Sequence, residues 1–141
     1  MNFENYLDEI LKLAEEALKI DNVPIGAIVV CDGKIIGKGY NMKNKSHIVT
    51  DHAEIIAINE ACKALNDWRL DKCELFSTLE PCNMCKEVIK QSRIKKVNYL
   101  LKSDFYNENG RNVDYFLFDE KFRKKAEKYE LLLKEFFNNK R

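Results

Sequence analysis

The sequence predicts a three-layer α/β/α sandwich, in which helices cover both faces of one mixed sheet of four to five strands. Apolar residues recur at helical spacing in several stretches, and short apolar runs bounded by turn residues stand between those stretches. A helix and a hairpin followed by alternating strands and helices is the order typical of helices packed on both faces of a sheet. The length of 141 residues suits a single domain over 1–141.

The first half of the chain contains a helix, a hairpin and a second helix. The expected elements are a helix over 2–20, strands over 25–30 and 35–40, a polar loop over 41–50 and a helix over 52–65. The first helix ends before Pro24, because proline disfavours a helical conformation in the residue before it. Asp32-Gly33 between two apolar runs is a strong hairpin signal.

The second half alternates strands and helices. The expected elements are a short strand at 75–76, a helix over 82–91, a strand over 97–101 and a helix that includes 122–136. Pro81 suits the N-terminus of the helix over 82–91, because the N–H group that proline lacks would have no partner in the helix there. The segment 113–118 fits either a strand or the start of the last helix, so the number of strands stays four or five.

Composition excludes a membrane-spanning protein and favours the cytoplasm. Hydrophobic residues make up 45% and charged residues 33% of the chain, proportions of a soluble globular domain. No apolar run approaches the roughly 18 residues of a transmembrane helix, and the N-terminus lacks the pattern of a signal peptide. The five cysteines are an odd number, which favours reduced thiols and directs attention to metal binding or catalysis.

Charge is distributed unevenly, although the net charge is only +1. The stretch 86–102 carries six basic residues against the single acid Glu87: Lys86, Lys90, Arg93, Lys95, Lys96 and Lys102. Such a stretch is compatible with a nucleic-acid footprint on the C-terminal half. On charge alone, solvated helix faces in a lysine-rich chain explain it better.

Two short motifs predict a metal site. His52-Ala53-Glu54 and Pro81-Cys82-Asn83-Met84-Cys85 each open a predicted helix. A helix N-terminus favours the thiolate forms that a metal needs, and zinc accepts thiolate and imidazole ligands together. His52, Cys82 and Cys85 therefore predict one zinc ion with an open fourth position for a water, whose pKa falls to about 7 when zinc binds it.

Glu54 predicts hydrolytic chemistry at that site. Two residues after His52 in the first turn of a helix, it can reach the water without binding the metal, and act as general base and then general acid. His-x-Glu followed by Pro-Cys-x-x-Cys is the signature of zinc-dependent nucleobase deaminases.

Two other readings of the cysteines compete with this one. A redox Cys-x-x-Cys pair lacks the strand-then-helix setting of a thioredoxin fold near the N-terminus. A structural zinc site needs a fourth ligand, for which no candidate repeats a paired spacing with another: Cys31, Cys62, Cys73 and His47. The cysteines among them are better read as small core residues, and His47 as an exposed loop residue.

On these motifs the chain resembles the cytidine/deoxycytidylate deaminase superfamily, and within it the bacterial tRNA adenosine deaminases that form inosine at the wobble position. The resemblance is specific over 22–101, where it extends beyond the zinc motifs to the segments 22–27, 39–41, 68–70, 78–82 and 92–94. Outside that range it includes the segment 131–137. It implies the cytidine deaminase type of α/β/α sandwich, a zinc cofactor, a tRNA anticodon loop as substrate and a homodimer.

The resemblance also implies how a target base is held. Asn41 would hydrogen-bond the base, the backbone of Ala53 would read its edge, and Val23 would pack against its ring. From their charge and aromatic character, seven further residues are possible nucleic-acid contacts, the last four gripping a loop at the C-terminal end: Arg93, Lys95, Lys96, Phe136, Phe137, Lys140 and Arg141.

The chain departs from the family pattern outside the zinc motifs. The stretch 103–111 holds one glycine where the tRNA enzymes carry a lysine- and glycine-rich loop, and Lys86-Glu87 replaces the small residues usual after the second cysteine. Asp51 stands where a small residue commonly precedes the histidine. These differences bear on substrate choice, so deamination of a free base or nucleoside is the alternative function. A zinc-containing RNA-binding module without catalysis is a third, which the presence of Glu54 disfavours.

Overall fold

The computed structural model describes residues 3–103 and 113–139, which form a mixed five-stranded sheet in the order β2-β1-β3-β4-β5. Its elements in chain order are α1 (Phe3–Lys19), β1 (Gly26–Cys31), β2 (Lys34–Tyr40), α2 (Lys43–Ser46), α3 (Ala53–Leu65), β3 (Cys73–Leu79), α4 (Asn83–Gln91), β4 (Lys96–Leu101), β5 (Asp114–Leu117), the 3-10 turn η1 (Glu120–Phe122) and α5 (Arg123–Asn139). β1 runs antiparallel to both β2 and β3, whereas β3, β4 and β5 are parallel.

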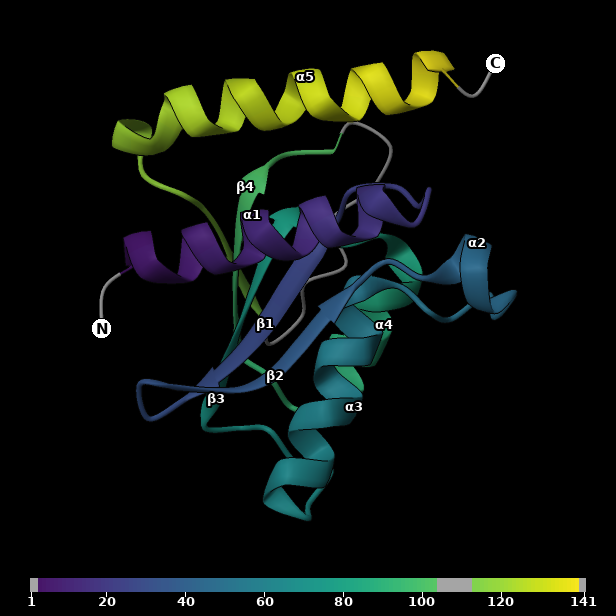
Figure 1. Ribbon diagram of the computed structural model, residues 1–141. Coiled ribbons are helices and arrows are strands. Elements are labelled where there is room, and N and C mark those ends of the chain that lie inside the picture. Colours follow the sequence, from purple (N-terminus) through teal and green to yellow (C-terminus); the bar gives the residue numbers. More distant parts are fainter. Residues whose placement is uncertain (1–2, 104–112, 140–141) are drawn as a thin grey trace.

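Helices cover both faces of the sheet, which confirms the predicted three-layer sandwich (Figure 1). The alternation of side chains along β1 divides the core into two halves. Ile28 and Val30 face the layer of α1 and α5, whereas Ala27 and Val29 face the layer of α3 and α4. The small alanine on the second face lets α3 lie close to the sheet.

Glycines in β2 bring α3 still closer. A Cβ atom on Gly37 would overlap the carbonyl oxygen of Ala57, and one on Gly39 would overlap the carbonyl oxygen of Ala53. Both strand residues therefore need to be glycine, because the helix backbone occupies the space of a side chain. The close approach fixes the position of the first turn of α3, which begins at Ala53.

A buried hydrogen-bond network attaches α5 to the start of the sheet. The Tyr129 hydroxyl donates to the carbonyl oxygen of Pro24 at 2.7 Å and accepts from Thr78 Oγ1 at 2.9 Å. Thr78 Oγ1 in turn accepts from the backbone N–H of Gly26 at 3.1 Å. Tyr129 is only 2% exposed, so these bonds form away from water, and burial raises the pKa of its hydroxyl.

The structure resolves one open alternative of the sequence prediction and differs from that prediction in two places. The segment 113–118 contains a true strand, β5, which pairs with β4 and gives the sheet its fifth strand. The loop predicted over 41–50 contains the short helix α2. β3 is longer than the predicted 75–76, because its polar residues Ser77 and Thr78 are buried and hydrogen-bonded rather than marking the end of the strand.

No helix in the described ranges, 3–103 and 113–139, is both long enough and apolar enough to span a bilayer.

Tyr129→Phe should destabilise the protein by about 1–3 kcal/mol, because it leaves the buried Pro24 carbonyl and the Thr78 hydroxyl without their partner. Urea unfolding of the metal-free chain measures this difference. Tyr6→Phe is the matched control: Tyr6 is also buried, but its hydroxyl makes only a 3.4 Å bond to the carbonyl oxygen of Gly33. Equal losses in the two variants would contradict the assigned role of the Tyr129 network.

Candidate active site

The N-termini of α3 and α4 lie next to each other on one face of the sheet. His52 is the N-cap residue of α3 and Cys82 is the N-cap residue of α4, and both have extended backbone conformations. The first backbone N–H groups of each helix therefore point toward the space between them. The positive ends of both helix dipoles favour anionic groups at this position.

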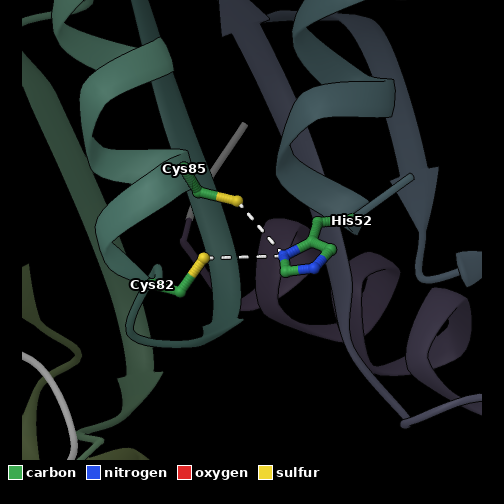
Figure 2. Close-up of side chains that lie close together, drawn as sticks. All are labelled: His52, Cys82 and Cys85. Atoms are coloured by element: carbon green, nitrogen blue, oxygen red, sulfur yellow. Dashed lines mark hydrogen bonds between the residues drawn. The ribbon is translucent and has the colours of Figure 1, made fainter. Parts of the chain in front are cut away.

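His52, Cys82 and Cys85 converge in this space (Figure 2). Each cysteine sulfur lies 3.5 Å from Nδ1 of His52, and all three possible ligand atoms lie within 4.8 Å of one another. Tetrahedral zinc with ordinary Zn–S and Zn–N bonds would separate sulfur and nitrogen ligands by about 3.5 Å. The spacing therefore fits one zinc ion with three protein ligands and an open fourth position.

The contact between the two thiols shifts their pKa values in opposite directions. The hydrogen bond from Cys85 lowers the pKa of Cys82 to about 4, and a second contribution comes from His52. The same bond raises the pKa of Cys85, as does burial of that side chain. The pKa of His52 is raised by its hydrogen bond to Cys82. The low pKa of Cys82 favours the thiolate form that a metal ligand needs.

Glu54 lies in the first turn of α3, two residues after His52. Its side chain is 3% exposed, and burial raises the pKa of its carboxyl group to about 7. The negative character of Cys82 adds to this rise. A carboxyl group with a pKa near neutrality is able to take up and release a proton under physiological conditions.

Of the predicted base-binding residues, Asn41 and Ala53 lie next to His52, whereas Val23 packs against the core on the α1 side of the sheet. Asn41 is 7% exposed. The next residue, Met42, donates its backbone N–H to the carbonyl oxygen of Asp51 at 3.0 Å, and this bond brings Asn41 close to His52. Asn41 Oδ1 accepts from the backbone N–H of Lys43 at 3.1 Å. Asn41 Nδ2 makes no hydrogen bond to another described residue, so its N–H groups can donate to a ligand. Ala53 is fully buried and Val23 half-buried.

Asn22, for which the sequence predicted no role, holds the loop before β1 against α2. It is fully buried, its Oδ1 accepts from the backbone N–H of Asn44 at 2.7 Å, and its Nδ2 donates to the carbonyl oxygen of Ile20 at 3.0 Å. It thereby attaches α2 to the end of α1. The position of Asn22 immediately before Val23-Pro24 was the available signal. Lys43 on α2 lies near enough to His52 for its charge to oppose the rise in the pKa of that imidazole.

Most of the predicted nucleic-acid contacts lie elsewhere. Arg93, Lys95 and Lys96 follow the C-terminal end of α4, about 15 Å along the helix from Cys82. The guanidinium of Arg93 lies 5.7 Å from the centre of the exposed Trp68 ring, so its contact in the chain is a cation–π pair. Lys95 and Lys96 are exposed.

The residues predicted at the C-terminal end divide by burial. Phe136 is 7% exposed and belongs to the core, which corrects its prediction as a base-stacking side chain, whereas Phe137 is 50% exposed. Lys140 and Arg141 lie outside the described residues. Lys86 is a second correction, because this member of the basic stretch is buried against Glu80 and is not part of a charged surface.

No alternative fourth ligand joins the cluster in the described part of the chain. Cys31 and Cys73 oppose each other across β1 and β3. Cys62 lies next to the carbonyl oxygen of Trp68, at 3.8 Å, and His47 ends α2. Cys73 is a buried core residue, as expected, whereas Cys31 and Cys62 are only partly buried. The structural-zinc reading therefore lacks the ligand that it needs.

Comparison with known proteins identifies the family. A family model described as the cytidine and deoxycytidylate deaminase zinc-binding region matches residues 1–101. The chain belongs to this family. The matched range contains the motifs of both helix N-termini, and zinc is therefore confirmed as the predicted cofactor.

Relatives in this deaminase family include tRNA enzymes and a free-base enzyme. The chain is 41% identical to a tRNA-specific adenosine deaminase of Aquifex aeolicus, over 97% of this chain and 95% of that protein. A solved structure from work on A-to-I editing by tRNA:A34 deaminases has a TM-score of 0.75 and 32% identity, covering 82% of this chain and 98% of that one. The guanine deaminase of Bacillus subtilis has a TM-score of 0.69 and 30% identity, covering 92% and 94%.

Other curated relatives match only in part. The chain spans 58% of the length of one tRNA-specific adenosine deaminase and 55–59% of several more, in each case over 94 residues.

In the metal-free chain, the contribution of Glu54 to stability should fall as the pH rises from about 4.5 to about 7, because the unfolded chain releases the Glu54 proton at a lower pH than the folded chain. Glu54→Gln removes this charge. We expect the variant to be more stable than the wild type by about 1–3 kcal/mol at pH 8 and nearly equal to it at pH 4. Urea unfolding with a chelator at both pH values tests this, and a difference independent of pH would contradict it.

Gly39→Ala should weaken zinc binding by about tenfold or more, because the new Cβ pushes the first turn of α3 away from β2 and displaces His52. The measurement is competition for zinc with a chromophoric chelator. Gly33→Ala is the matched control, since Gly33 has a φ of +75° but no atom within 4 Å of the added Cβ. It should cost about 1 kcal/mol of stability and leave zinc affinity unchanged. Equal zinc affinity in both variants would contradict the prediction.

Proposed function

We propose that this chain deaminates adenosine to inosine at the wobble position of a tRNA anticodon loop. The observation that carries the proposal is the combination of the convergent His52, Cys82 and Cys85 with a buried Glu54 next to them. Similarity over nearly the whole chain to a tRNA-specific adenosine deaminase supports the choice of substrate. Water is consumed, the exocyclic amino group leaves as ammonia, and the base retains its glycosidic bond.

His52, Cys82 and Cys85 would hold the zinc ion through Nδ1 and the two sulfurs. When bound, zinc lowers the pKa of a coordinated water to about 7 and so supplies the nucleophile at neutral pH. The low pKa of Cys82 prepares the site, because only the thiolate binds the metal. The positive ends of the α3 and α4 dipoles stabilise the same negative charges.

Glu54 would move the protons. As a carboxylate it accepts a proton from the attacking water, and as a carboxylic acid it returns a proton to the adenine ring nitrogen. Its pKa of about 7 makes both forms accessible at neutral pH. Burial in the first turn of α3 holds the carboxyl group in place and keeps it from exchanging protons freely with bulk water.

Asn41, Ala53 and Val23 would bind the base. The Asn41 side-chain amide can donate to an acceptor on the base, the backbone N–H of Ala53 at the start of α3 can read its edge, and Val23 can pack against the ring. A base reaches such a pocket by leaving its stack, which costs a few kcal/mol and costs less in an anticodon loop than in a duplex.

The surroundings of the pocket suit a polynucleotide. Lys43 and Lys45 on α2, with the exposed Ile48 and Val49 that follow, lie on the loop that leads to His52. Lys95, Lys96 and Phe137 would contact more distant parts of the tRNA. A homodimer, a cytoplasmic location and a single domain over 1–141 complete the proposal.

Deamination of a free base is the second candidate. The specific observation that favours it is the similarity to a guanine deaminase over most of both chains. The proposed chemistry is the same for both candidates, so the substrate alone separates them.

A deamination assay on zinc-loaded protein distinguishes these functions. The substrates are an anticodon stem-loop with adenosine at the wobble position, the same stem-loop with adenosine at a neighbouring position, and free guanine, cytosine, cytidine and adenosine. We expect inosine only at the wobble position, and Glu54→Ala should lower the rate by about 100–10,000-fold. Glu87→Ala, which removes an exposed acid on α4, is the matched control and should retain full activity.

Turnover of a small base alone would support the second candidate function, deamination of a free base, with the same zinc-dependent chemistry. RNA binding without turnover, or full activity in Glu54→Ala, would support the non-catalytic module and contradict the proposal.

A further inference from the structure

A buried ion pair encloses the turn that carries both cysteines. Lys86 Nζ lies 3.0 Å from Glu80 Oε2, and the two side chains are 2% and 6% exposed. The other ion pairs between described residues lie at the surface. Glu80 stands two residues before Cys82 and Lys86 immediately follows Cys85, so the pair joins the two ends of the Cys-x-x-Cys turn.

Glu80 attaches this turn to the end of β4. Its second carboxylate oxygen, Oε1, accepts from the backbone N–H of Ser103 at 3.1 Å. Its own backbone N–H donates to the carbonyl oxygen of Leu101 at 2.9 Å. Both oxygens of the carboxylate therefore have partners, and the residue before Pro81 is held by side chain and backbone together.

Lys86 attaches the other side of the turn to β5. Its Nζ lies 5.1 Å from the centre of the Tyr115 ring, a favourable position for a cation. Its backbone N–H donates to the carbonyl oxygen of Cys82 at 2.8 Å and closes the first turn of α4. The ammonium group therefore lies between Glu80, next to the end of β3, and Tyr115 on β5.

We propose that the Glu80–Lys86 ion pair is a positioning element for zinc: it holds the 81–85 turn in the shape that brings both cysteine sulfurs to His52 before the metal binds. The inference rests on the proposed metal site. Both residues would act through the cysteines that lie between them in the sequence.

Physical reasoning favours geometry over stability as the benefit of this pair. Removing two charges from water costs several kcal/mol, and well-packed apolar residues often stabilise a protein as much as a buried ion pair does. The pair offers what apolar packing does not, namely directional bonds from one carboxylate to Lys86 and to Ser103. Groups that orient metal ligands without touching the metal commonly contribute 10–100-fold to metal affinity.

The test compares zinc affinity with metal-free stability in Glu80→Gln, Lys86→Met and the double variant. Each single variant leaves a buried group without its partner and should lose both stability and zinc affinity, the latter by about 10–100-fold. The double variant removes both charges of the pair, so its stability should return toward that of the wild type. Its zinc affinity should stay low, and the absorption spectrum of bound Co²⁺ should differ from that of the wild type, because the turn is no longer fixed.

Lys125→Met is the matched control, since it breaks the surface pair in which Lys125 Nζ lies 2.7 Å from Asp8. It should bind zinc as the wild type does. A double variant that recovers both stability and zinc affinity would overturn the inference, as would single variants with unchanged zinc affinity. A wild-type chain that binds no zinc would instead overturn the proposed function, so the two failures are distinguishable.

Discussion

The site depends on one geometric constraint: the N-termini of α3 and α4 have to meet on the same face of the sheet. Each terminus carries part of the metal cluster, His52 from α3 and Cys82 with Cys85 from α4. Neither helix can supply a complete ligand set. The close packing of α3 on β2, for which Gly37 and Gly39 leave room, therefore sets the chemistry as well as the fold.

The opposite layer supports the site without contributing to the cluster. α5 crosses the other face of the sheet, and its Tyr129 reaches Pro24 and Thr78 through buried hydrogen bonds. Pro24 follows Val23, one of the predicted base-binding residues, and Thr78 lies on the strand that leads to Cys82. The C-terminal helix thus holds both segments in place from the opposite face of the sheet.

Charge is concentrated around the turn that carries the cysteines. Glu54, Glu80 and the two thiols bring several potential negative charges into a region that is largely removed from water, and Lys86 is the buried cation among them. A divalent metal adds positive charge where the helix dipoles already favour anions. The arrangement is therefore suited to binding a cation, and the raised pKa of Glu54 is a direct consequence of the same burial.

The sequence by itself determined the layers, most helix and strand positions and the four residues of the metal cluster and its acid, because periodicity, Pro24, Asp32-Gly33 and the two motifs are local signals. Only the tertiary structure decided which charged and aromatic side chains are buried. Lys86 is buried although lysine is usually exposed, Phe136 lies in the core and not on a nucleic-acid-binding surface, and Arg93 packs on Trp68 at the far end of α4. Only the tertiary structure decided, likewise, that the segment 113–118 contains a strand that pairs with β4. Burial and strand pairing depend on partners many residues away, and no local pattern in a single chain specifies those partners.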